Sequence, residues 1–284
     1  MSSFDMTENT IERSEGPSLF FRHHLSKNEK ARMVIVHGLG EHSGRYSALA
    51  KRLVELDISV WILDLRGHGK SGGQQGHVES FDDYTRDVMH VMDRALADKP
   101  AGSKCFLLGH SMGGLVAILF ALEHQNLIDG LAVSSPALGV AAPVPAIKKI
   151  GATLLSRIFP RLGIKNEIDP QNISHDPEIV KKYMDDPLVH NRVSTAWYIQ
   201  FVKAMEKAHS RAAGINIPIL VQAAGEDRLV STKAVVAFFE SLTVPDQSLR
   251  VYNGLYHEIY NELEPDRKKV ISELTDWLSE RIDR

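Results

Sequence analysis

A serine flanked by glycines gives the first indication of chemistry in this chain. Residues 105–108 are apolar and predict a strand, residues 109–113 form a Gly-x-Ser-x-Gly turn, and an apolar helix begins directly afterwards. This context predicts a nucleophile elbow, in which Gly109 and Gly113 lack the Cβ atoms that would clash where strand and helix cross. The helix N-terminus would stabilise the anion formed when a serine attacks a carbonyl group. Ser111 is therefore the expected nucleophile.

A serine hydroxyl needs a histidine to remove its proton and an acid to orient that histidine. In hydrolases with this elbow, the acid and then the histidine follow the serine, each on a loop after a later strand. The apolar run 217–224 leads into a loop with Asp227, and the alternating run 248–253 leads into a loop with His257. We predict Asp227 as the acid, with its neighbour Glu226 as the alternative, and His257 as the base.

The other histidines suggest a possible metal site. The chain contains 13 histidines, of which only His257 follows the predicted acid. Four of the others, His37, His42, His68 and His77, are the candidate ligands of a zinc site. Their spacing matches no compact ligand pattern, and no cysteine pair assists them. We therefore expect no metal and no cofactor.

An oxyanion hole needs two N–H donors aimed at the developing negative charge. The residue after the nucleophile, Met112, is the expected first donor. The mainly apolar strand expected at 32–36 leads into a loop in which Leu39 lies between two glycines, which leave its N–H unobstructed. We expect Leu39 to be the second donor, although this loop alone could be an ordinary strand-to-helix turn.

Five separated segments resemble the monoglyceride lipase and lysophospholipase family of α/β-hydrolases. They are HGLGEHSGRY at 37–46, DLRGHGKS at 64–71, GHV at 76–78 with FDDY at 81–84, GHSMGG at 109–114, and DRL at 227–229 with HE at 257–258. The resemblance implies Ser111 as nucleophile with Asp227 and His257 as partners, and Leu39 and Met112 as oxyanion donors. It also implies a cap inserted after the strand that follows the elbow helix, where substrate choice is decided.

The order of elements agrees with an α/β fold. The expected strands are 19–25, 32–36, 58–64, 104–108, 130–135, 217–224 and 248–253, and the expected helices are 47–56, 81–97, the elbow helix, 232–241 and 265–281. About eighty residues separate the fifth and sixth strands, far more than an ordinary connection needs. We predict a mostly parallel sheet flanked by helices, with core residues 1–136 and 215–284 and a helical cap at 137–214.

Two segments of the cap could meet a lipid. Residues 144–159 project as an amphipathic, basic helix with Ile147 on its apolar face. This pattern suits either a helix packed on the core or an interfacial helix that takes lipid from an anionic surface. Trp197, Phe201 and Met205 form an apolar stripe, which could pack or line an acyl-chain pocket. The residues expected to contact substrate are Glu41, His110, Ile147, Trp197, Phe201 and Met205.

Composition limits the remaining classes of function. A formal net charge of −3 provides no basic field for nucleic acid. The single cysteine, Cys105, excludes a disulfide within the chain and fits a reducing compartment. Residues 1–17 lack the apolar core of a secretion signal, and the longest apolar run, 115–122, is shorter than the roughly 18 residues of a membrane span. We expect a soluble cytoplasmic protein that could still be peripheral on a membrane; its oligomeric state is left open.

These predictions favour a serine ester hydrolase that cleaves single-acyl-chain lipids, either monoacylglycerols or lysophospholipids, through an acyl-enzyme on Ser111. A broad short-chain carboxylesterase or an aminopeptidase of the same fold is the alternative. A non-catalytic ligand-binding scaffold is disfavoured because a binder needs neither a base nor an acid. A dehalogenase is excluded because that chemistry requires an aspartate at the position of Ser111.

Overall fold

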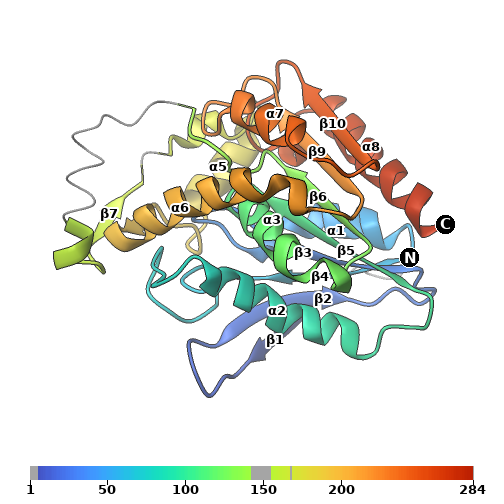
Figure 1. Cartoon of the computed structure of the whole chain (residues 1–284), viewed down its shortest axis with the longest axis horizontal. Coiled ribbons are helices and arrows are strands. Elements are labelled where there is room, and N and C mark those ends of the chain that lie inside the picture. Colours follow the sequence, from blue (N-terminus) through green and yellow to red (C-terminus); the bar gives the residue numbers. More distant parts are fainter. Residues whose placement is uncertain (1–5, 142–154, 167, 284) are drawn as a thin grey trace.

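The centre of the molecule is an eight-stranded sheet with the order β1-β2-β4-β3-β5-β6-β9-β10 (Figure 1). The computed structural model describes residues 6–141, 155–166 and 168–283. The strands are β1 Thr7–Ile11, β2 Leu19–His24, β3 Ala31–Val36, β4 Ile58–Leu63, β5 Lys104–His110, β6 Gly130–Ser134, β9 Ile219–Ala224 and β10 Gln247–Tyr252. Within this eight-stranded sheet as described, only the pairings of β2 with β1 and β4 are antiparallel. The expected mostly parallel sheet is confirmed, with an additional edge strand, β1.

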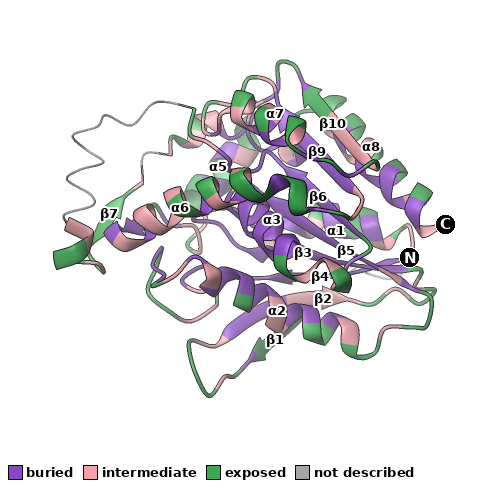
Figure 2. Cartoon of the chain, in the orientation of Figure 1, coloured by how far each residue is buried: buried purple, intermediate pink, exposed green. Residues whose placement is uncertain are grey.

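Helices cover both faces of this sheet because its central strands are apolar on both faces. In β3, Val34 and Val36 face one core cluster while Met33 and Ile35 face the other. The first cluster is completed by α2 Asp82–Ala97, α3 Met112–His124 and α7 Thr232–Glu240. The second is completed by α1 Ser47–Val54 and α8 Asp266–Ile282. Figure 2 shows the resulting arrangement, with buried strands inside and exposed residues on the outer helix surfaces.

The parallel strands bring the predicted site residues to one edge of the sheet. Ser111 follows β5, and Leu39 follows its neighbour β3. Asp227 and His257 follow the adjacent strands β9 and β10. The carboxyl ends of parallel strands lie on the same side, where ligands bind in open α/β sheets.

The long segment between β6 and β9 contains both helices and strands. Its described elements include α5 Pro177–Asp185, α6 Thr195–Arg211 and an antiparallel pair, β7 Gly163–Lys165 with β8 Arg192–Ser194. This strand pair was not expected alongside the helices of the predicted cap, because each strand is too short for an alternating pattern to be recognised. Residues 155–158 of the expected amphipathic helix are helical, whereas Ile147 lies outside the described residues. The boundaries 137–214 stay a prediction.

Candidate active site

Ser111 occupies a strained turn between β5 and α3. Its φ of 53° and ψ of −121° place a non-glycine residue in a rarely populated region, as expected for an elbow. A Cβ at Gly109 would lie 2.2 Å from the carbonyl oxygen of Gly113. A Cβ at Gly113 would lie 2.3 Å from the carbonyl oxygens of Val36 and His37. Both glycines are therefore required by the close approach of α3 to β5 and β3.

His257 and Asp227 form a buried hydrogen-bonded pair. His257 Nδ1 lies 2.7 Å from Asp227 Oδ2, and the other carboxylate oxygen accepts the backbone N–H groups of Leu229 at 2.9 Å and Val230 at 2.8 Å. Burial alone would raise the pKa of Asp227, but the charge of His257 and these hydrogen bonds hold it below the ordinary value. Burial alone would lower the pKa of His257, but Asp227 raises it above the ordinary value.

The neighbouring carboxylate of Glu226 is placed differently. Glu226 is exposed, and its described interaction with the histidine loop is a backbone hydrogen bond from its N–H to the carbonyl oxygen of Leu255, at 3.0 Å. Because Asp227 holds the imidazole Nδ1 of His257, the geometry favours Asp227 over Glu226 as the orienting acid.

Ser111 and His257 line one cavity of about 560 Å³. Leu39 and Met112 also line it, so both predicted oxyanion donors share this cavity with the serine. Its walls are predominantly apolar and include Leu155, Ile164, Val193, Trp197, Phe201, Leu229 and Val230. Such walls suit an apolar chain.

The predicted substrate-contacting residues fall into three groups. Glu41, His110, Trp197 and Phe201 line the cavity. Met205 is not among the lining residues and instead packs, partly buried, against the core. Ile147 lies outside the described residues. The roles of all six stay predictions.

A buried charge network supports the Leu39 loop. Glu41 Oε1 accepts the N–H of Gly38 at 2.6 Å and the hydroxyl of Tyr46 at 2.7 Å, while Oε2 accepts Arg45 Nη1 at 2.5 Å. Burial alone would raise the pKa of Glu41, but the charge of Arg45 is the largest of the effects that lower it to about 2. Glu41 therefore holds the loop as an anion.

Arg45 joins this loop to two other parts of the site. Its guanidinium makes two hydrogen bonds of 2.7 Å to the carboxylate of Glu258, the residue after His257. It also lies over the ring of Tyr183 in α5, 4.8 Å from the centroid. The sequence analysis missed Arg45, Glu258 and Tyr183; the only signal was that Arg45 and Glu258 belong to motifs named for other reasons.

The four histidines of the zinc alternative each have a protein partner. His37 bonds the carbonyl of Gly38 and the N–H of Leu65, and the partners of His42, His68 and His77 are Asp186, the carbonyl of Arg66 and Ser194. Within residues 6–141, 155–166 and 168–283, no group of three or more candidate ligands could hold a metal ion. The zinc alternative therefore finds no support in this part of the chain.

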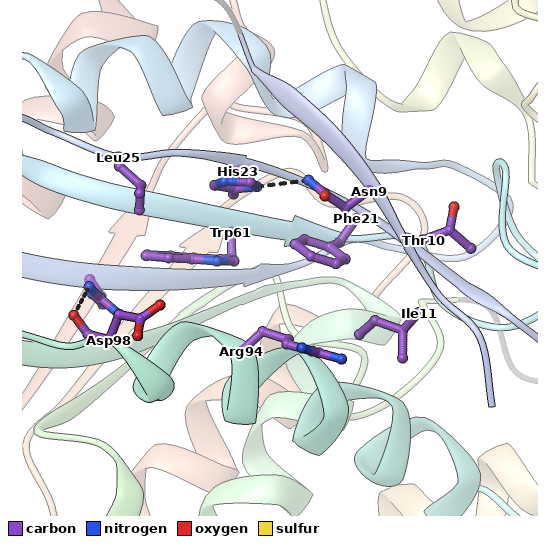
Figure 3. Close-up of a pocket in the computed structure, with 10 residues that line it drawn as sticks. Asn9, Thr10, Ile11, Phe21, His23, Leu25, Trp61, Arg94 and Asp98 are labelled. Carbon is purple, nitrogen blue, oxygen red and sulfur yellow. Dashed lines mark hydrogen bonds between the residues drawn. The ribbon is translucent and has the colours of Figure 1, made fainter. Parts of the chain in front are cut away.

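A second cavity, of about 320 Å³, lies between the β1–β2–β4 edge of the sheet and α2 (Figure 3). The rings of His23 and Trp61 are stacked there, with centroids 6.0 Å apart, and Arg94 of α2 also lines it. Its lining includes neither Ser111 nor His257. The predicted ester chemistry therefore belongs to the larger cavity.

The sheet, the elbow and the acid and histidine loops define an α/β-hydrolase fold. Residues 27–264 match a family model described as serine aminopeptidase, S33. Human monoglyceride lipase is 34% identical over 94% of this chain and 89% of its own length. Phospholipase YtpA of Bacillus subtilis is 34% identical over 84% of this chain and 91% of its own length.

A solved structure shows the same relationship in three dimensions. The crystal structure of Paleococcus ferrophilus monoacylglycerol lipase is 32% identical, has a TM-score of 0.84, and covers 98% of this chain and 100% of its own. This chain therefore belongs to the serine aminopeptidase S33 family of α/β-hydrolases, with monoglyceride lipases among its relatives. The expected fold class, family and enzyme class are confirmed. Among the described residues, no helix is long and apolar enough to span a membrane.

Proposed function

We propose that this protein hydrolyses esters of lipids with one acyl chain through an acyl-enzyme on Ser111. His257 directs Nδ1 to Asp227, which leaves Nε2 to take the proton of Ser111 as its Oγ bonds to the ester carbonyl carbon. The N–H groups of Leu39 and Met112 stabilise the oxyanion. Collapse expels the alcohol, which receives the proton from His257. Water activated by His257 then releases the fatty acid and restores Ser111.

The observation that carries this proposal is the His257–Asp227 pair at the wall of an apolar cavity that Ser111 also lines. Relatives named monoglyceride lipase and phospholipase support a lipid ester as substrate. The acyl chain would lie along Trp197 and Phe201, where each buried methylene adds about 0.8 kcal/mol of binding. Segment 137–214 would then act as the cap that selects the chain.

A small polar head group fits the polar part of the cavity lining. Glu41, His110, Tyr183 and Glu258 line it on the same side as the Leu39 loop and the histidine loop. Hydroxyl groups of a glycerol could exchange hydrogen bonds with these side chains. A monoacylglycerol is therefore the first candidate substrate.

A lysophospholipid is the second candidate, because two cationic residues also line this cavity. Lys165 and Arg228 are exposed and lie among the lining residues, where they could attract a phosphate group. An aminopeptidase reaction is disfavoured because a free amino group would need an unpaired carboxylate. The carboxylates that line the cavity, among described residues, are Glu41 and Glu258, and both are bonded to Arg45.

Peripheral membrane contact through the cap is also part of this proposal. Ile158, Phe159 and Leu162 are 60%, 58% and 45% exposed, and Arg157 and Arg161 beside them are exposed too. Apolar and basic side chains together suit an anionic lipid surface. Phe159→Ser should reduce co-sedimentation with anionic vesicles, and equal binding by both proteins would contradict this contact.

The free thiol of buried Cys105 supports a cytoplasmic location.

The test of the substrate class is a hydrolysis profile. Rates would be measured on p-nitrophenyl esters of increasing chain length, a monoacylglycerol and lysophosphatidylcholine, with Ser111→Ala as the inactive control. We expect kcat/KM to rise from acetate to medium and long chains. A profile that peaks at acetate would favour the short-chain carboxylesterase alternative.

A further inference from the structure

A buried amide lies between two tyrosines that bracket the histidine loop. Tyr252 ends β10 immediately before loop 253–258, and Tyr260 follows that loop in a short 3-10 helix, Ile259–Asn261. The hydroxyl of Tyr260 donates to Gln222 Oε1 at 2.6 Å, and Gln222 Nε2 donates to the hydroxyl of Tyr252 at 2.5 Å. Gln222 is on β9 and is fully buried. One side chain therefore contacts both ends of the loop that carries His257.

The chemistry of the partners fixes the orientation of this amide. The carboxylate of Glu273 accepts from the hydroxyl of Tyr252 at 2.9 Å, so that hydroxyl is left to accept from Gln222. The carbonyl of Val270 also accepts from Gln222 Nε2, at 3.0 Å. Oε1 must then face Tyr260, whose hydroxyl must donate. Burial raises the pKa of Tyr260, which keeps this donor protonated.

Backbone hydrogen bonds extend the same connection to the acid loop. Three residues after β9 ends, the chain reaches Asp227. The N–H of Gly225 donates to the carbonyl of Tyr252 at 2.8 Å, and the N–H of Glu226 donates to the carbonyl of Leu255 at 3.0 Å. The acid loop and the start of the histidine loop are thus joined directly. The end of the histidine loop is joined to β9 through Tyr260 and Gln222.

We propose that Gln222 is a positioning residue that holds both ends of the His257 loop against the strand that carries Asp227. This inference rests on the proposed triad. Gln222 is not among the residues that line the substrate cavity, so it acts through His257 rather than on the substrate. Without it, the His257–Asp227 hydrogen bond loosens. Asp227 raises the pKa of His257 against the effect of burial, so loosening this pair lowers that pKa.

The test is Gln222→Leu, which replaces the amide with an apolar side chain of similar size. We expect kcat on p-nitrophenyl butyrate to fall roughly ten- to a hundredfold, the range produced by a small misplacement of a catalytic group, with KM within about twofold. The acid limb of kcat/KM should move to lower pH, because this limb reports the base of the free enzyme. Circular dichroism would confirm that the variant is folded at the assay temperature.

Arg281→Met is the matched control, on α8, the helix that also carries Val270, a hydrogen-bond partner of Gln222. Arg281 bonds the carbonyl of Trp277 and pairs with Asp246, at the end of β10 far from the histidine loop. The Arg281→Met substitution should lower the melting temperature, while kcat and the acid limb of kcat/KM stay unchanged. If Gln222→Leu does not fold, Tyr260→Phe removes one hydrogen bond of the same network and should shift the limb in the same direction.

The role of Gln222 is overturned if the folded variant, or Tyr260→Phe, keeps the parent kcat and acid limb. Failure of this positioning role can be distinguished experimentally from failure of the proposed triad. An active Ser111→Ala protein would overturn the triad, whereas an inactive Ser111→Ala protein beside an unshifted Gln222→Leu limb would overturn only the role of Gln222.

Discussion

The buried guanidinium of Arg45 allows a quantitative test of how the site is held. Its Nη1 lies 2.5 Å from Glu41 Oε2 and 2.7 Å from Glu258 Oε1, so Arg45→Met leaves two buried carboxylates without their cation. In the folded protein the pKa of Glu41 is lowered from 4.5 to about 2. That lowering, to which Arg45 contributes most and His110, His37 and Tyr46 contribute less, corresponds to about 3 kcal/mol of stability at neutral pH. We therefore expect Arg45→Met to lower the free energy of unfolding at pH 7 by about 3 kcal/mol, as for other broken buried pairs.

The assay is urea unfolding followed by circular dichroism, with Arg52→Met as the control. Arg52 pairs with Glu55 on the surface, where their side chains are 56% and 47% exposed, and such pairs contribute about 0–1 kcal/mol. Because the pKa of Glu41 is lowered, the contribution of Arg45 is complete above pH 4.5 or so and is lost as the pH falls towards 2. Equal losses in the two variants at pH 7, or a loss in Arg45→Met that does not shrink on acidification, would refute the reasoning.

Three further outcomes concern the catalytic groups and the cavity wall. Asp227→Asn should lower kcat on a p-nitrophenyl ester by roughly 10⁴, because the histidine would be held in the wrong tautomer; a larger loss in Glu226→Gln would reverse the assignment of the acid. The kcat/KM of the parent should fall on acidification through a pKa above 6.5, since Asp227 raises the pKa of His257, and an acid limb below 6.5 in a pH titration would contradict this. Trp197→Ser should reduce monoacylglycerol turnover more than p-nitrophenyl acetate turnover, and equal losses would mean that this wall supports the fold without selecting the chain.

The arrangement of the candidate site could be predicted from sequence because each part is local. The elbow needs two glycines around Ser111 between a strand and a helix, and all of these lie within one short segment. Asp227 follows an apolar strand and His257 follows an alternating one, and parallel strands bring their carboxyl ends to one edge. The large gap between strands likewise indicated an insertion.

The contacts between distant segments could not be predicted in this way. The local sequence around Arg45 is typical of a charged residue on the surface. The tertiary structure alone places Glu258 and Tyr183 against it. Gln222 interrupts an otherwise apolar strand, and its partners come from three later elements. Local pattern carries no information on such pairings, because a buried polar group is satisfied by whichever partners the fold brings near.

The most direct test of the central claim is the release of fatty acid from a monoacylglycerol by the parent protein and by Ser111→Ala. Circular dichroism on both proteins would verify that the variant is folded. Ser111 forms the covalent bond in the proposed mechanism, so we expect the rate of the variant to be lower than that of the parent by at least roughly 10³-fold. The remaining catalysis would come from substrate binding and the oxyanion hole. A fluorophosphonate should add one adduct, located by mass spectrometry at Ser111, to the parent only. A folded variant that keeps most of the parent rate, or an adduct at another residue, would contradict the account.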